Sequence, residues 1–357
     1  MSVADMSPLL SFLADNTKAD RLSAEEFSLL LADARACGLL GRVAHHLLSR
    51  PQASTLAPNL TDQLLAATTQ SRGFRQDIWR ELAHIERALA HLKTPVILLK
   101  GASYVYLELP PADGRTFSDI DILVSRDQIA QAEAALMLGG WATGSLNSYD
   151  QRYYRHWAHE IPPMTHLQRG TTIDLHHSLV MPTCRIKVDS SRMISAAIAA
   201  AGSQFWYRLQ DEDTVLHAVS HLMLNSEFDR GLRDLWDIDM LYRHFVLSAD
   251  DFPNRLFARA QAVGLQTLLL QVLALTSRCF STPLPDFAVA ADNTLFLRMM
   301  ARAASARHPD TKPWGQGAAD FGLMLREMYL RLPPKLLAVH LWHKMSELLA
   351  APEKEAL

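Results

Sequence analysis

The fold of this chain is decided by two stretches of sequence, Leu98-Leu99-Lys100-Gly101 and Arg115-Thr116-Phe117-Ser118-Asp119-Ile120-Asp121-Ile122-Leu123-Val124. In a strand, residues i and i+2 point to the same face, so Asp119 and Asp121 would project side by side while Ile120 and Ile122 turn into the core. Two adjacent like charges destabilise a strand unless a positive charge lies between them. Mg²⁺ prefers one or two carboxylates together with substrate phosphates, so the pattern predicts a magnesium site.

The alternative interpretation of this pair is an edge strand with a solvated acidic face. The apolar neighbours of the two aspartates, which continue to Val124, favour a buried strand instead. Arg115 and Ser118 lie just upstream, where they are candidates for contacts to phosphate oxygens. A polar loop with no ligand is the equally open alternative for these two residues.

Lys100 and Gly101 lie where an apolar strand predicted over 95–99 enters a helix predicted over 102–109. Such a junction presents free backbone N–H groups and the positive end of the helix dipole. Gly101 allows a ligand to approach the backbone closely, and Lys100 adds a point charge. These features suit a triphosphate, although an ordinary strand-to-helix turn also uses glycine.

A third acidic residue, Asp174, lies in the segment Thr171-Thr172-Ile173-Asp174-Leu175-His176. If this segment is a strand beside the first two aspartates, three carboxylates can hold two Mg²⁺ ions for phosphoryl or nucleotidyl transfer. Asp174 would then hold metal or act as the base for an acceptor hydroxyl. A surface strand residue is the alternative. The period of two places His176 on the same face, as a substrate contact or as a structural residue.

The pattern along the chain predicts an α+β protein in three parts. Residues 1–72 are predicted to be helical, with a capping box at 23–26. Residues 73–205 contain the α/β core with a small mixed sheet, and residues 206–357 are predicted to form an all-helical domain.

Composition narrows the class of protein. Hydrophobic residues make up 49% and charged residues 20%, and the formal net charge is −3, which does not favour nucleic acid as a partner without excluding it. The three cysteines form no CxxC pair, so neither a disulfide framework nor a zinc knuckle is expected. No secretory signal and no transmembrane run is apparent, and we expect a cytoplasmic protein.

The order Lys-Gly, then Arg…Ser-Asp-Ile-Asp-Ile-Leu-Val, then Ile-Asp-Leu-His resembles the nucleotidyltransferase superfamily that includes DNA polymerase β. More narrowly, it resembles a bacterial nucleotidyltransferase family in which Lys-Gly replaces the Gly-Ser of many relatives. The resemblance is specific over about residues 95–180 and extends more weakly to the segment 217–237. The serine hydroxyl that usually touches the terminal phosphate is missing here, and Ser118 or Lys100 is a candidate to replace it.

The resemblance implies a Mg²⁺-dependent enzyme that transfers a nucleoside monophosphate from an NTP such as ATP to an acceptor hydroxyl and releases pyrophosphate. Two Mg²⁺ ions would be held by Asp119, Asp121 and Asp174, and the Lys100–Gly101 pair would occupy the phosphate-loop position. The acceptor is open between protein, small molecule and nucleic acid. The alternative hypothesis is a nucleotide-binding regulatory or interaction module without turnover.

Overall fold

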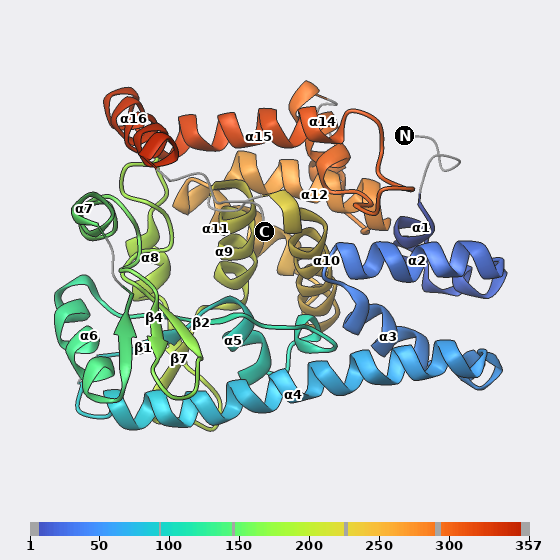
Figure 1. Ribbon diagram of the computed structural model, residues 1–357, viewed down its shortest axis with the longest axis horizontal. Helices are drawn as coiled ribbons and strands as arrows, with labels where there is room; N and C mark the ends of the chain where they lie inside the picture. Colours follow the sequence, from blue (N-terminus) through green and yellow to red (C-terminus); the bar gives the residue numbers. More distant parts are fainter. Residues whose placement is uncertain (1–6, 93, 145–146, 225–227, 290–293, 351–357) are drawn as a thin grey trace.

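The computed structural model describes residues 7–92, 94–144, 147–224, 228–289 and 294–350. Figure 1 shows the strands at one end of the molecule, the long helix α4 (Pro58–Leu89) along one side and α15 (Gln316–Arg331) along the opposite side. Helices of the C-terminal half fill the space between them. The predicted fold class, α+β with a mixed sheet and a helical C-terminal region, is confirmed.

Seven strands form one mixed sheet in the order β3-β4-β5-β2-β1-β7-β6. They are β1 (Val96–Leu98), β2 (Asp119–Leu123), β3 (Trp141–Thr143), β4 (Met164–His166), β5 (Thr172–His176), β6 (Ile198–Ala199) and β7 (Trp206–Arg208). β2 runs parallel to β5 and antiparallel to β1, so it has a neighbour on each side. Ile120 and Ile122 are 2% and 0% exposed. The alternative of a solvated edge strand therefore does not hold for β2.

The helices fall into three groups along the chain. The N-terminal group comprises α1 (Pro8–Ala14), α2 (Ala24–Ala36), α3 (Leu40–Leu48) and α4. Those between the strands are α5 (Lys100–Tyr106), α6 (Ile129–Leu138), α7 (Ser148–His156) and α8 (Ser190–Ser195). The last group comprises α9 (Asp211–Leu224), α10 (Gly231–Ser248), α11 (Phe252–Val263), α12 (Gln266–Phe280), α13 (Asp286–Val289), α14 (Leu295–Ala303), α15 and α16 (Pro334–Ala350).

Two local features show how the predicted parts relate to these elements. The capping box exists: Ser23 caps α2, and the Glu26 carboxylate accepts a hydrogen bond from the Ser23 backbone at 2.9 Å. Helix α4 passes through residue 72, and the sheet still includes β7 after residue 205. The domain borders placed at these two positions therefore remain predictions.

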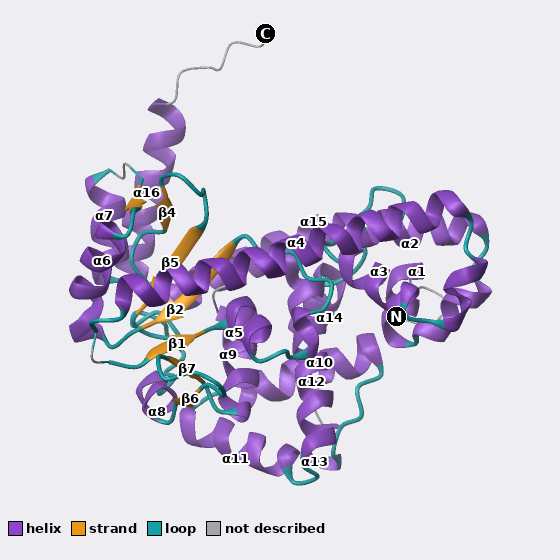
Figure 2. Ribbon diagram, turned by 90° about the horizontal axis from the view of Figure 1, so that it is seen from below, coloured by secondary structure: helices purple, strands orange, loops and turns teal. Residues whose placement is uncertain are grey.

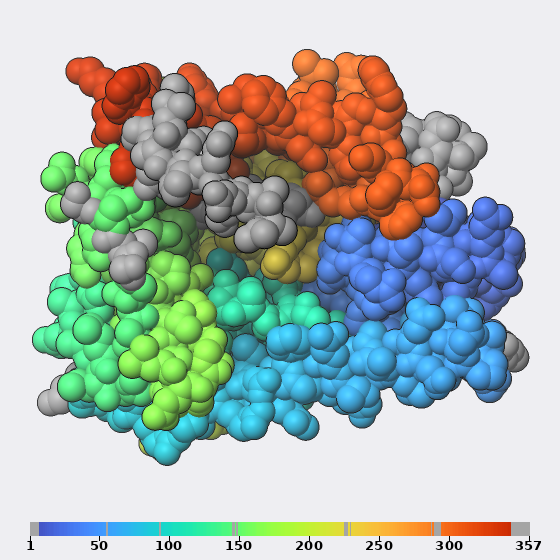
Figure 3. All heavy atoms as spheres, in the orientation of Figure 1, coloured from blue at the N-terminus to red at the C-terminus, as the bar shows by residue number. Residues whose placement is uncertain are grey.

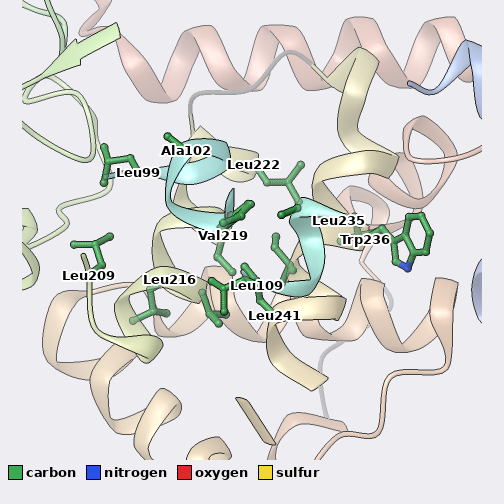
Figure 4. Close-up of a cluster of buried hydrophobic side chains, with 14 of the residues drawn as sticks. Leu99, Ala102, Leu109, Leu209, Leu216, Val219, Leu222, Leu235, Trp236 and Leu241 are labelled. Atoms are coloured by element: carbon green, nitrogen blue, oxygen red, sulfur yellow. The ribbon is translucent and has the colours of Figure 1, made fainter. Parts of the chain in front are cut away.

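A shared hydrophobic core joins the sheet to the C-terminal helices. Figure 4 shows Leu99 and Ala102, at the start of α5, together with Val219 of α9 and Leu235 of α10. All four side chains are no more than 1% exposed. Because α9 and α10 pack against the segment that carries Lys100 and Gly101, the helical region forms one wall of the site described below.

The N-terminal helices contact the C-terminal half directly. The carboxylate of Asp33 in α2 is fully buried and accepts a hydrogen bond from the His308 backbone N–H at 3.1 Å. Figure 3 shows the corresponding blue and orange segments against each other on one face of the molecule. The sheet and both helical regions therefore pack together.

Helix α4 passes across the strands of the sheet in Figure 2, and it also holds the turn between β4 and β5. Arg169 donates two hydrogen bonds of 2.8 Å to the Glu81 carboxylate, and Thr171 donates a third of 2.6 Å. Burial alone raises the pKa of Glu81, but the hydrogen bonds from Arg169 and Thr171 outweigh it and lower that pKa below its usual value. The Glu81 side chain is only 3% exposed, so these contacts fix the end of β5 against the helix.

We expect Glu81→Gln to lower the free energy of unfolding at neutral pH by roughly 1–3 kcal/mol, because buried donors lose a charged acceptor. A carboxyl whose pKa is lower in the folded state than in the unfolded state stabilises the fold. For Glu81 this contribution is complete at pH values above the unfolded-state pKa of 4.5, and it is lost as the pH falls further. The difference in the free energy of unfolding between wild type and Glu81→Gln, measured with urea, should therefore become smaller below pH 4.5. Glu86→Gln, in the same helix, is the control. A difference in the free energy of unfolding that stays constant with pH would contradict this role for the Glu81 charge.

Candidate active site

Strand pairing brings the predicted aspartates onto one face of the sheet. Asp121 of β2 and Asp174 of β5 are direct register partners in a parallel ladder, and Asp119 is opposite Thr172 two residues earlier. Residues that are directly paired or two apart in neighbouring strands share a face. The structure therefore places all three aspartates on one face of the sheet, and their role as a shared metal site stays a prediction.

The electrostatics of this face fit a cation. Burial, followed by the charges of Asp121, Glu160 and Asp119, raises the pKa of Asp174 to about 8. Its Oδ1 atom is buried and has no hydrogen-bond partner among the residues that the structure describes. Because hard divalent cations take oxygen ligands and neutralise such crowded carboxylates, these residues suit Mg²⁺.

Lys100 supplies a positive charge on the same face. Its Nζ donates a 2.7 Å hydrogen bond to Asp121 Oδ1. Burial raises the pKa of Asp121, but Lys100 and His176 outweigh it and hold that carboxyl well below its usual pKa. Lys100 has φ of 41°, a left-handed backbone conformation that costs a non-glycine residue about 1–3 kcal/mol. This strained turn delivers the ammonium group to Asp121.

Gly101 is explained by packing in this structure. A Cβ atom at this position would lie 2.6 Å from Cδ1 of the Phe117 ring, which is closer than carbon atoms approach. The structure therefore gives a reason for glycine here besides close approach of a ligand. Phe117 also belongs to the loop that carries Arg115 and Ser118, so the contact sets the shape of the cleft.

We expect Gly101→Ala to lower the free energy of unfolding by about 1–3 kcal/mol, because the Phe117 ring must move. Gly73→Ala is a matched control, since Gly73 is inside α4 and a Cβ there meets nothing within 4 Å. That control should stabilise the protein by about 0.5–1 kcal/mol through helix propensity. Thermal unfolding of the two variants checks the direction of both stability changes. An unchanged midpoint for Gly101→Ala would show that the Phe117 ring does not prevent a side chain at residue 101.

A cleft of about 220 Å³ opens between the sheet and α9–α10. Six of the predicted site residues line it: Lys100, Gly101, Arg115, Ser118, Asp119 and Asp121. The opposite wall contributes His221, Arg230, Arg233, Asp234 and Asp237. Asp174 and His176 do not line this cleft; they adjoin Asp121 in the sheet.

Arg115 is held in place by the helical region. Its guanidinium forms an ion pair with Asp237 of α10, and Arg42 of α3 pairs with the same carboxylate. Arg115 Nε is buried and has no hydrogen-bond partner within the described ranges. Ser118 donates a 3.0 Å hydrogen bond to Asp119. The predicted phosphate contact thus remains a prediction for both residues, and Arg115 retains one unused donor for it.

His176 lies deeper than a substrate contact requires, since its side chain is only 1% exposed. Its Nε2 atom is 3.0 Å from Asp121 Oδ1 and 3.4 Å from Glu160 Oε2. Sequence reasoning missed Glu160, because residue 160 joins the sheet only through an isolated bridge to His176 and has no strand pattern around it. The residues that precede it, 148–156, form helix α7.

A comparison with protein-family models gives a match over most of the chain. The model described as "uncharacterised nucleotidyltransferase" covers residues 23–281, more than half of the chain. The chain belongs to this family. Membership in this nucleotidyltransferase family implies an NTP substrate. The search of curated proteins and the search of solved structures returned no match to the chain. Over the described residues, no helix is long and apolar enough to cross a membrane.

Proposed function

We propose that this nucleotidyltransferase moves a nucleoside monophosphate from an NTP to an acceptor hydroxyl in a Mg²⁺-dependent reaction that releases pyrophosphate. The observation that carries the proposal is the register pairing of Asp121 with Asp174, with Asp119 on the same face. Asp119 and Asp121 line a cleft that also contains basic residues, and Asp174 is the register partner of Asp121 in the next strand, which supports the proposal.

The metal would be held by Asp119, Asp121 and Asp174. When bound, Mg²⁺ neutralises the triphosphate and aligns the reacting oxygens for in-line displacement. The unused donor of Arg115 and the ammonium of Lys100 are suited to hold phosphate oxygens in the cleft. Lys100 lies at the Asp121 carboxylate, so it couples phosphate binding to the acidic face.

Asp174 has a second possible use in the same reaction. Burial and the neighbouring carboxylates raise the pKa of Asp174 in the metal-free site, and a carboxyl with a raised pKa accepts a proton more readily than an ordinary one. Its partnerless Oδ1 is then the atom that takes the proton of the acceptor hydroxyl. Both roles require a carboxylate, and Asp174→Asn removes both.

The proposal is tested with the full chain, Mg²⁺ and each of the four NTPs labelled at the α-phosphate. Protein, RNA and small-molecule pools serve as acceptors, and the readouts are transferred label and released pyrophosphate. Label transfer that depends on Mg²⁺ and on Asp119 supports the proposal that the protein is an active nucleotidyltransferase. Nucleotide binding without turnover in any pool would favour the regulatory module, and absence of binding would refute both.

A further inference from the structure

Outside the aspartate triad, a second group of metal-ligand side chains lies next to Asp121. Among the described residues, His159, Glu160 and His176 each place one ligand atom within 4.8 Å of the other two. Glu160 Oε2 lies 3.4 Å from His176 Nε2 and 3.8 Å from His159 Nε2. The two imidazole rings have their centroids 5.2 Å apart.

The two distances from Glu160 Oε2 are close to the edge length of a tetrahedral site. Zinc ligands at about 2.0–2.1 Å from the metal are separated from each other by roughly 3.3 Å. The two distances from Glu160 are close to that value, so little movement of the side chains is needed. The isolated bridge between residues 160 and 176 fixes the backbone on both sides of the cluster.

The surroundings of the histidines also favour a cation. The side chains of His159 and His176 are 8% and 1% exposed. His176 Nε2 faces two carboxylates, Asp121 at 3.0 Å and Glu160 at 3.4 Å, and a single N–H is shared poorly between two acceptors. A metal ion at Nε2 would balance the carboxylates without requiring a charged imidazole.

The donor set separates this cluster from the aspartate triad. Two imidazoles and one carboxylate suit zinc and other late first-row divalent ions, whereas Mg²⁺ prefers all-oxygen sites. Glu160 retains 22% side-chain exposure, which leaves a path for the ion to enter. We propose that His159, Glu160 and His176 form a transition-metal site, with zinc as the preferred ion, beside the carboxylates of the active site. This site does not depend on the proposed nucleotidyl transfer.

The test uses the full chain, stripped with chelator and then titrated with Co²⁺ in excess Mg²⁺. Co²⁺ reports its ligands through visible absorption, and Zn²⁺ should displace it. We expect one Co²⁺ per chain, and at least about a 100-fold loss of Zn²⁺ affinity in His159→Ala and in Glu160→Gln. Glu160→Gln keeps the size of the side chain, so it tests the site even if His159→Ala fails to fold.

His177→Ala is the matched control, because His177 follows His176 but is outside the cluster, and it should bind Co²⁺ as wild type does. Asp119→Asn should also retain the Co²⁺ spectrum. The proposal is overturned if wild type binds no Co²⁺ in excess Mg²⁺, or if Glu160→Gln binds it unchanged. It is also overturned if Asp119→Asn abolishes the spectrum, since the ion would then occupy the aspartate triad. A failure of nucleotidyl transfer alone leaves these readouts unaffected.

Discussion

Asp119→Asn is expected to lower the rate of nucleotidyl transfer by about a thousandfold or more while leaving the fold intact. In the proposed mechanism the variant loses a carboxylate ligand for Mg²⁺. A bound metal contributes several kcal/mol to stabilising the transition state, and each 1.36 kcal/mol corresponds to a tenfold change in rate. Asp119 is half-buried, and its hydrogen bond from Ser118 can also be accepted by an amide oxygen. The measurement is Mg²⁺-dependent pyrophosphate release.

Asp62→Asn, on an exposed position of α4, is the control and should behave as wild type. Unfolding of Asp119→Asn by urea should match wild type, which separates a catalytic effect from a structural one. Retention of more than a tenth of the activity in Asp119→Asn would contradict the assignment of this residue as a metal ligand.

Asp174→Asn should separate stability from activity at the same site. Without metal, the Asp174 carboxyl is crowded by Asp121, Glu160 and Asp119, so a neutral amide relieves repulsion. We expect the metal-free variant to be at least as stable as metal-free wild type, yet to show no transfer and no stabilisation by Mg²⁺ with NTP. Thermal unfolding with and without these ligands measures the difference. A Mg²⁺-dependent shift equal to wild type would remove Asp174 from the site.

Asp237→Asn is expected to have the largest effect on stability, a loss of about 3–5 kcal/mol in the free energy of unfolding. Asp237 is 4% exposed and forms ion pairs with both Arg42 and Arg115. Arg42 is itself 1% exposed and also donates to the Pro111 carbonyl at 2.7 Å. The variant leaves two buried cations without the carboxylate that both of them ion-pair with. Removal of one partner of a buried pair is far more costly than replacement of the whole pair.

Urea unfolding measures this loss, with Asp250→Asn as a control at an exposed position between α10 and α11. Because Asp237 also orients Arg115 at the cleft, NTP affinity should fall in Asp237→Asn even under conditions where the variant is folded. A loss below 1 kcal/mol would mean that water or a neighbouring group compensates the two arginines, and the network would then not be a structural link between α3, α10 and the cleft.

Some of the site was predictable because it is local. The period of two along β2 is a property of any strand, so it sets Asp119 and Asp121 on one face whatever the rest of the fold. Asp174 required one further step: its apolar neighbours indicated a strand, but sequence could not give its parallel register with β2. The structure supplied that register, which decides that Asp174 is opposite Asp121 and not one position away on the other face.

Other features could not be predicted because their partners are distant in sequence. Lys100 was expected to add a point charge at the phosphate-binding turn, but the sequence could not show that its ammonium pairs with Asp121 across the sheet. Arg115 and Ser118 could not be assigned before the position of α10 was known. Glu160 carried no periodic signal, since its backbone pairs with β5 through an isolated bridge outside any strand.

The sequence by itself determined the α+β class, the buried acidic strand and the position of Asp119 and Asp121 on one face of that strand. These features follow from hydrophobic periodicity and capping, which act over a few residues. Only the tertiary structure decided which charges meet. Asp174 beside Asp121, Glu160 between two histidines, and Asp237 between Arg42 and Arg115 each depend on how separate elements pack. Side-chain contacts between distant segments are fixed by the shared core, and no local pattern encodes them.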